Sequence, residues 1–166
     1  MLRAQWWWRA SPIRHPGEGM FVDTILVGTD FSDLAHGAID WAIELGRALG
    51  ARVVVAHVFD LPIVGFPDAS FVVGPEAAVR MLEDAQRGLD AEVARVRDRG
   101  VPVEAVLRQG DARDALPAIA ASMGAGLLVV GSHGRRGLAR ALLGSVAEGV
   151  VRASANVPVT VVHSKK

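Results

Sequence analysis

Apolar and polar residues alternate along most of the chain in blocks that predict strands and helices by turns. Short apolar runs rich in β-branched residues, each followed by small or polar residues, predict strands. Five such strands are expected, at 23–30, 52–60, 102–109, 125–132 and 157–163. The third alternates apolar and polar residues, as a strand at the edge of a sheet does. The fourth is the most apolar of the five, which predicts a place inside the sheet.

Between these strands, apolar residues recur at the three- and four-residue spacing of amphipathic helices. The first predicted helix, 32–49, begins at a candidate N-cap, Ser32, and ends before Gly50. Its apolar stripe is Leu34, Ala38, Trp41, Ala42, Leu45 and Leu49. The second predicted helix runs from about Pro75 to Arg99, and its stripe is Ala78, Met81, Leu82, Ala85, Leu89, Val93 and Val96.

Two shorter helices complete the pattern. Pro117 is tolerated only near the start of a helix, so the third is expected from about Asp114 to Met123. The fourth is expected at 144–153. The segment 61–75 contains prolines and glycines and is expected to be a loop, a candidate lid or partner surface.

Strands that alternate with helices predict the α/β class, here a single doubly wound parallel sheet of five strands. Two strand orders are common at this size, 3-2-1-4-5 and 2-1-3-4-5. An edge-like third strand and an apolar fourth strand favour 3-2-1-4-5, a Rossmann-like order. In it the winding reverses between strands 1 and 4, and ligands bind outside the carboxyl ends of the strands at such a reversal. The candidate site therefore includes 28–32 and 129–134.

The composition excludes several classes of function. The chain has 166 residues, 51% hydrophobic content, a formal net charge of +0 and no cysteine. A neutral chain has no global attraction for nucleic acid or an anionic membrane, and neither partner is expected. Without cysteine there are no disulfides, thiolate nucleophiles or cysteine metal sites, and a cytoplasmic location is compatible with that. No apolar run approaches the roughly 18 residues that span a bilayer.

Residues 1–20 differ from the rest, with three consecutive tryptophans, Trp6, Trp7 and Trp8, beside arginines. They are interpreted as a poorly ordered tail, or as the result of a start codon placed too early. A membrane-interface anchor is the alternative, because tryptophan and arginine favour that zone. The folded domain is expected to be 21–164.

The stretch "VVGSHGRRGLARALLGSVAEG" (129–149) carries the clearest chemistry. Gly131 and Gly134 allow the chain to turn sharply after the fourth strand and let a ligand approach the backbone. Gly144 and Ser145 stand where a helix begins, and a helix N-terminus offers unpaired N–H groups to a phosphate. Arg135, Arg136 and Arg140 add positive charge. The stretch predicts a phosphate-binding loop, but not a Walker A loop, because no lysine precedes Ser145.

Other candidate residues follow the first and second strands. Asp30 could accept hydrogen bonds from ribose or hold a divalent metal against phosphates; alternatively, Asp30 or Ser32 only caps the following helix. Val58 could lay its backbone along an adenine edge or be part of the core. His36, His57 and His133 could converge near the strand ends, but their spacing matches no ligand pair, and metal ligation by histidine is not expected.

These residues resemble the bacterial universal stress proteins of the UspA type. "GSHGRRGLARALLGS" fits the pattern Gly-x2-Gly-x9-Gly-Ser/Thr, and "VGTDFS", "AHV" and "NVPVTVV" fit the same family over about 21–163. The resemblance implies an adenine nucleotide alpha hydrolase-like fold and places this chain in the branch that binds ATP. The nucleotide site that it implies comprises Thr29, Asp30, Val58, Val130, Gly131, Ser132, His133, Gly134, Arg135, Gly144, Ser145 and Val146.

With a nucleotide bound, Mg²⁺ or Mn²⁺ could bridge its phosphates, with Asp30 as an indirect ligand through them. The resemblance further implies a homodimer in which the last strands, 157–163, pair antiparallel across a two-fold axis. Gly28 and Pro117 depart from the usual family pattern. Three functions are compatible with these residues: a nucleotide-binding module in a stress response, a slow ATPase that uses Asp30, and a nucleotide-free dimeric interaction protein. The absence of a convincing general base favours the first over the second.

Overall fold

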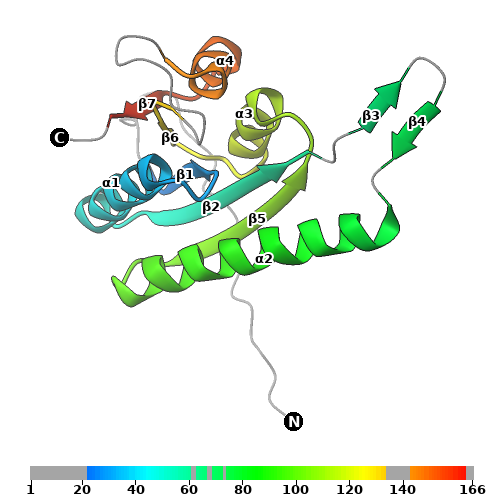
Figure 1. Ribbon diagram of the computed structural model, residues 1–166. Helices are drawn as coiled ribbons and strands as arrows, with labels where there is room; N and C mark the ends of the chain where they lie inside the picture. The colour runs from blue at the N-terminus through cyan, green and yellow to red at the C-terminus, as the bar shows by residue number, and fades with distance from the viewer. Residues whose placement is uncertain (1–21, 61–62, 67–68, 73, 134–142, 164–166) are drawn as a thin grey trace.

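The main sheet has five parallel strands in the predicted order. The computed structural model describes residues 22–60, 63–66, 69–72, 74–133 and 143–163. Its sheet strands are β1 (Thr24–Thr29), β2 (Arg52–Phe59), β5 (Val103–Gln109), β6 (Leu127–Gly131) and β7 (Val159–Val162). They lie side by side as β5-β2-β1-β6-β7, every pair parallel (Figure 1). This is the 3-2-1-4-5 order expected from the sequence, which is thereby confirmed.

Four helices cover the two faces of the sheet. They are α1 (Asp33–Leu49), α2 (Pro75–Asp98), α3 (Ala112–Ser122) and α4 (Ser145–Ala153). α1 and α2 pack on one face, and α3 and α4 pack on the other (Figure 1). α1 begins where the Ser32 hydroxyl accepts a hydrogen bond from the Ala35 amide (3.3 Å), and ends at Gly50 with φ 66°. Both boundaries match the predicted cap and stop.

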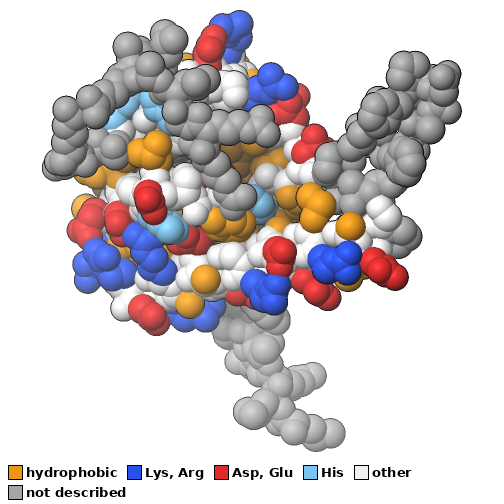
Figure 2. Space-filling model, in the orientation of Figure 1, with side chains coloured by type: hydrophobic (Ala, Val, Ile, Leu, Met, Phe, Trp, Pro, Cys, Tyr) orange, Lys and Arg blue, Asp and Glu red, His pale blue; other side chains and the backbone are white. Residues whose placement is uncertain are grey.

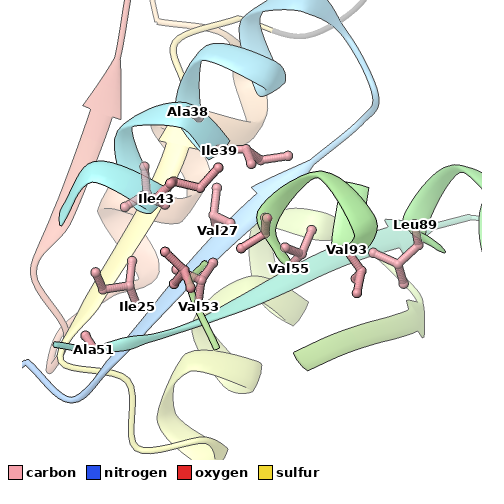
Figure 3. Packing of buried hydrophobic residues seen from close by; sticks show 14 residues of the cluster. Ile25, Val27, Ala38, Ile39, Ile43, Ala51, Val53, Val55, Leu89 and Val93 are labelled. Atoms are coloured by element: carbon pink, nitrogen blue, oxygen red, sulfur yellow. The ribbon is translucent and has the colours of Figure 1, made fainter. Parts of the chain in front are cut away.

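Two layers of core residues explain why the central strands are apolar without alternation. On the α1/α2 face, Ile39 and Ile43 of α1 and Leu89 of α2 pack against strand residues such as Ile25 and Val53 (Figure 3). On the opposite face, the buried cluster is Leu26, Val54, Ala56, Leu116, Ile119, Ala120, Ala125, Leu128, Val130, Ala147 and Val150. Strands covered on both faces need apolar side chains at every position, because neither face meets water.

The segment 61–75 was expected to be a loop, and that expectation is wrong in part. β3 (Ile63–Phe66) and β4 (Ala69–Val72) pair antiparallel as a separate two-stranded sheet, at the upper right of Figure 1. Their sequences, IVGF and ASFV, are rich in β-branched and aromatic residues, and Pro67–Asp68 between them is a turn-favouring pair. Over Ile63–Phe66 and Ala69–Val72 the segment is therefore a pair of strands rather than an irregular loop.

The predicted start of the third helix is also wrong. α3 begins two residues earlier than Asp114, because the side chain of Asp111 caps it by accepting a hydrogen bond from the Arg113 amide (2.9 Å). Pro117 consequently lies inside the helix rather than in its first turn. A proline at that position removes one intrahelical hydrogen bond, so the cap and the packed residues Leu116 and Ile119 must stabilise the helix against it.

Replacement of Asp111 by alanine is expected to destabilise the fold by about 1 kcal/mol at neutral pH, the usual effect of removing an N-cap. Hydrogen bonds from the Arg113 side chain and amide lower the pKa of Asp111 from 3.8 to about 2. Because this pKa is depressed in the folded state, the stabilisation is complete above pH 4 and is lost as the pH falls from about 4 to about 2. Urea unfolding of both proteins across this range measures the effect.

The matched control for this prediction is Asp111→Asn, which keeps a side-chain oxygen for the cap but carries no charge. Its unfolding free energy should stay near that of the wild type at neutral pH and should lack the acid-dependent loss. A difference between wild type and Asp111→Ala that persists undiminished at pH 2 contradicts the charge-assisted cap.

The two apolar stripes predicted for α1 and α2 are only partly buried. In α1 the buried residues are Ala35, Ala38, Ile39, Ala42, Ile43 and Gly46. Trp41 and Leu49, which the sequence pattern placed on the core side, are 47% and 53% exposed. Met81 and Leu82 of α2 are also exposed, because the helix becomes buried only from Ala85 onward. The three-residue spacing alone could not tell a buried stripe from an exposed flank.

Ion pairs join α1 to α2. His36 Nε2 lies 2.6 Å from Glu92 Oε1, and Arg95 Nη2 lies 2.7 Å from Asp40 Oδ1. Glu92 is 5% exposed, so its carboxylate is held between the two helices. A third pair connects Arg99 Nη2 with Glu44 Oε1 at 2.9 Å. These pairs show which flank of α1 faces α2.

Acidic and basic side chains are intermixed over the face of the molecule drawn in Figure 2, in keeping with the neutral net charge. Among the described residues, none of the helices is both long enough and apolar enough to cross a membrane.

Candidate functional site

The turn after β1 is held by side chains that bind its own backbone. Thr29 Oγ1 accepts a hydrogen bond from the Phe31 amide (3.0 Å), and Asp30 Oδ1 accepts one from the Ser32 amide (3.1 Å). Ser32 Oγ also donates to Asp30 Oδ1 at 2.5 Å. The Asp30 carboxylate is thereby fixed at the carboxyl edge of the sheet, directly before α1.

The two readings of Asp30 and Ser32 can now be separated. Ser32 is the residue that caps α1, since its hydroxyl accepts from the Ala35 amide. Asp30 does not cap the helix through the first-turn amides; it binds Ser32 instead. Capping therefore accounts for Ser32, and Asp30 supports the cap by binding the amide and hydroxyl of Ser32.

Phe31 is the one described residue other than glycine with a positive φ, 63°. Such a conformation costs of order 1 kcal/mol or more and requires surrounding contacts to hold it. The phenyl ring lies 4.2 Å from the His57 ring, and it reaches α2 at Gly88. A Cβ on Gly88 would lie 2.9 Å from the ring, so only glycine leaves room for it. The sequence reasoning missed both residues, because their contact is long-range.

The two halves of the glycine motif meet at the end of β6. The Gly144 amide donates a 2.7 Å hydrogen bond to the carbonyl of Ser132, which links the first residue of the motif's second half to the second residue of its first half. Ser132 is 2% exposed, and its own amide donates to the Val162 carbonyl at 2.8 Å. The N-terminus of α4 is therefore anchored beside the carboxyl end of β6, where the winding of the sheet reverses.

The first turn of α4 is not capped by a side chain. Gly144 is its N-cap residue, in an extended conformation (φ −65°, ψ 155°), and has no side chain to bind the helix amides. The amides of Ser145, Val146 and Ala147 precede the first helical hydrogen bond, which runs from Glu148 to Gly144 (2.9 Å). Ser145 and Val146 are exposed. An anion at this end would meet backbone donors and the positive end of the helix dipole.

Gly131 also has a packing role that the sequence did not indicate. Its φ lies outside the left-handed region that favours glycine. A Cβ at this position would lie 3.2 Å from the carbonyl oxygen of Leu34 in α1. The absence of a side chain thus lets β6 approach the first turn of α1, which is a packing reason for glycine at this position.

Val58 and Val130 lie on the face of the sheet that α3 and α4 cover. Val130 is 3% exposed and part of the core, whereas Val58 is partly buried at the end of β2, in register with Arg108 of β5. The structure therefore supports a core role for the side chain of Val130. Val58 packs against the same core cluster but is only partly buried.

The three histidines do not converge. His36 binds Glu92 on the α1/α2 face, and His57 Nδ1 lies 2.8 Å from the Thr29 carbonyl. His133 Nδ1 lies 3.1 Å from Ser132 Oγ, at the site. In the described ranges, no three histidine, aspartate or glutamate side chains gather as ligands of a metal ion would. Gly134, Arg135, Arg136 and Arg140 lie outside the described residues.

The chain is similar to proteins of one known family over almost all of its described residues. A family model described as the universal stress protein family matches residues 22–163. Universal stress protein MJ0531 of Methanocaldococcus jannaschii is 32% identical over 152 residues, which cover 90% of this chain and 86% of that protein.

Two solved structures share the fold and contain a nucleotide. A universal stress protein in complex with cAMP has a TM-score of 0.65 and 30% identity, over 87% of this chain and 98% of that one. The universal stress protein from Archaeoglobus fulgidus in complex with dAMP has a TM-score of 0.60 and 25% identity, over 86% and 98% of the two chains. The match over nearly the whole described fold means that this chain belongs to the universal stress protein family.

Proposed function

We propose that this chain is an adenine-nucleotide-binding module, with ATP as its ligand, acting in a cytoplasmic stress response. The nucleotide lies across the carboxyl ends of β1 and β6. Two relatives of the same fold were solved with cAMP and with dAMP, which supports an adenine nucleotide as the ligand class. The open strand ends at the reversal point are where α/β sheets of this kind bind ligands.

One observation carries the proposal: the hydrogen bond from the Gly144 amide to the Ser132 carbonyl (2.7 Å). It fixes the N-terminus of α4, which no side chain of its N-cap residue binds, beside the end of β6, and Ser145 and Val146 of this first turn are exposed. Their amides and the Ser145 hydroxyl are suited to phosphate oxygens. Ser132, His133, Gly134 and Arg135 follow β6 and are proposed to complete the phosphate contacts, with Gly131 as the support beneath them.

The residues at the carboxyl ends of β1 and β2, across the site from α4, are proposed to bind the nucleoside. Thr29 ends β1 and Asp30 follows it, and the carboxylate of Asp30 is suited to accept hydrogen bonds from ribose hydroxyls. The backbone at Val58 is proposed to meet the adenine edge, with Val130 packed beneath. Mg²⁺ commonly takes one or two carboxylates together with substrate phosphates. A single carboxylate at Asp30 fits that arrangement, so Mg²⁺ or Mn²⁺ would be held mainly by the phosphates.

Titration calorimetry tests the proposal directly. Protein unfolded, freed of co-purified small molecules and refolded should bind ATP and AMP saturably, and should bind GTP more weakly. Mass spectrometry of the released small molecules should show an adenine nucleotide. A refolded protein that binds none of these nucleotides contradicts the proposed function and favours a nucleotide-free interaction protein.

We also propose that the protein forms a homodimer through the last strand. β7 is at the edge of the sheet, and its four residues are only half-buried. Leu128 donates to the Pro158 carbonyl (2.9 Å) and Ser132 to the Val162 carbonyl (2.8 Å), so even-numbered residues of this segment bond to β6. In a parallel ladder the alternate residues, Val159 and Val161, then direct their N–H and C=O groups outward. These groups can pair with the same strand of a second copy.

Val161→Pro is expected to convert the dimer into a monomer while leaving the fold intact. Proline removes the outward N–H without removing a bond to β6, and proline is tolerated at such edge positions. Sedimentation velocity should show a weakening of association of about ten-fold or more, since two symmetric hydrogen bonds of ~1 kcal/mol each are lost. Val161→Ala, which keeps the amide, is the matched control and should still dimerise.

A further inference from the structure

The ring of Phe31 contacts both the carboxyl end of β2 and the middle of α2. Its centroid is 4.2 Å from that of the His57 ring in β2. The tip of the ring abuts α2 at Gly88, where a Cβ would lie 2.9 Å from both Cε2 and Cζ of the ring. Phe31 is also partly buried against the α1/α2 core cluster. Its side chain is therefore packed on elements that are distant from it in the sequence.

These contacts explain how an unfavourable backbone conformation is maintained. Among the described residues other than glycine, Phe31 alone has a positive φ, 63°. A side chain disfavours this left-handed region, which persists only where the surroundings impose it. The hydrogen bond from the Phe31 amide to Thr29 Oγ1 (3.0 Å) fastens one end of the residue. The packing of the ring is then what compensates for the cost of the conformation.

α2 presents a fixed surface to the ring. Glu92 follows Gly88 by about one helical turn, so both lie on the same face of α2. Glu92 is 5% exposed, and its Oε1 lies 2.6 Å from Nε2 of His36 in α1. His36 itself is about one turn after Ser32, the N-cap of α1. The ring cannot gain room by a displacement of α2 without disturbing this buried contact, which is costly to break.

The conformation of Phe31 determines where Asp30 is held. The two residues share a peptide group, and the Asp30 carboxylate binds the Ser32 amide (3.1 Å) and hydroxyl (2.5 Å) across Phe31. His57, which contacts the ring, also holds the residue before Asp30, because its Nδ1 lies 2.8 Å from the Thr29 carbonyl. A change in the turn at Phe31 would therefore move the carboxylate relative to the end of β1.

We propose that Phe31 is a positioning residue for the nucleotide: its ring, packed on His57 and Gly88, maintains the turn that holds the Asp30 carboxylate toward the ribose. The inference rests on the proposed function, in which Asp30 accepts hydrogen bonds from the ribose hydroxyls. Such bonds require the acceptor to stay within about 0.5 Å of its productive place, which packing around it must ensure. Phe31 and Gly88 thus act on the ribose through Asp30.

The first test replaces the ring. Leucine at position 31 stays apolar but is shorter than phenylalanine and leaves the space at Gly88 unfilled. Titration calorimetry compares ATP with 2′,3′-dideoxy-ATP, which lacks the ribose hydroxyls. The wild type should bind ATP about ten-fold or more tightly than the dideoxy analogue, the effect of hydrogen bonds to a charged group. Phe31→Leu should lose most of this preference by binding ATP more weakly, and should bind the analogue as the wild type does.

The second test displaces the ring from α2 without changing the turn itself. Gly88→Ala adds a single methyl group 2.9 Å from the ring, outside the proposed nucleotide site. It should reduce the preference for ATP as Phe31→Leu does, although alanine favours a helix. Gly37→Ala is the matched control: it adds the same methyl group to α1, where nothing lies within 4 Å, and should keep the wild-type preference. Circular dichroism and urea unfolding check that each variant is folded.

The outcomes separate the inference from the proposed function on which it rests. A wild-type protein that binds neither nucleotide contradicts both. A preference for ATP that survives in Asp30→Ala contradicts the role of Asp30 and, with it, the inference. A preference that Asp30→Ala removes but that Phe31→Leu and Gly88→Ala keep overturns the inference alone. An equal loss of affinity for both nucleotides in these two variants also overturns it, because the ring would then support the fold and not the ribose contact.

Discussion

Ser145→Asp is expected to lose nucleotide affinity by about 100-fold or more while its fold becomes no less stable. Ser145 is the first residue of α4 and is exposed. An acidic residue in the first turn of a helix stabilises it by about 0.3–1 kcal/mol through the helix dipole. The same negative charge repels phosphate oxygens that bind within about 4 Å, where a like-charge pair costs several kcal/mol near a protein surface. Urea unfolding and calorimetry with ATP measure the two effects separately.

Two controls make this result specific. Ser145→Ala keeps every backbone amide and removes only the hydroxyl, so its affinity for ATP should fall by about ten-fold or less, the value of one hydrogen bond. Val79→Asp adds the same charge to an exposed position of α2 and should bind ATP as the wild type does. Wild-type affinity in Ser145→Asp means that phosphates do not bind at the N-terminus of α4.

The fold could be predicted because its determinants are local. Central strands covered on both faces are continuous apolar runs, and Ser32 and Gly50 mark the ends of α1 in the sequence itself. The predictions of the start of α3 and of the segment 61–75 were wrong because, in each, neighbouring residues favour different local structures. Pro117 suggested a helix start, but the cap at Asp111 set it earlier. The prolines and glycines of 61–75 outweighed the β-branched residues that form β3 and β4.

The candidate site could be predicted only from the spacing of its glycines and Ser145 along the sequence. The glycines and Ser145 indicated two halves of one motif, and the hydrogen bond between Gly144 and Ser132 shows how they meet. The positive φ of Phe31 and its contact with Gly88 could not be predicted, since 57 residues separate them and no local pattern records which glycine leaves room for a ring. Long-range contacts of this kind determine where the Asp30 turn is held.

Gly131→Val is expected to lower the free energy of unfolding of the nucleotide-free protein by about 2–3 kcal/mol, the range of a severe overpacking. A Cβ alone would lie 3.2 Å from the Leu34 carbonyl oxygen, and the γ carbons of valine need still more room. The obstructing atoms belong to the backbone at the start of α1, so no side-chain rotation can relieve the clash. Urea unfolding in the absence of nucleotide measures the loss.

Two glycine-to-alanine variants show why this result concerns packing rather than loss of chain freedom. Gly131→Ala requires α1 to move by a few tenths of an ångström and should cost about 1 kcal/mol. Gly37→Ala adds a methyl group to α1 where nothing lies within 4 Å, and should stabilise the fold by about 0.5–1 kcal/mol. If Gly131→Val instead unfolds like the wild type without nucleotide and loses only ATP affinity, the glycine serves the ligand. If it is destabilised as expected, Gly131 holds β6 against α1. The proposed phosphate-binding loop after β6 and the Asp30 turn before α1 then depend on the same packing contact.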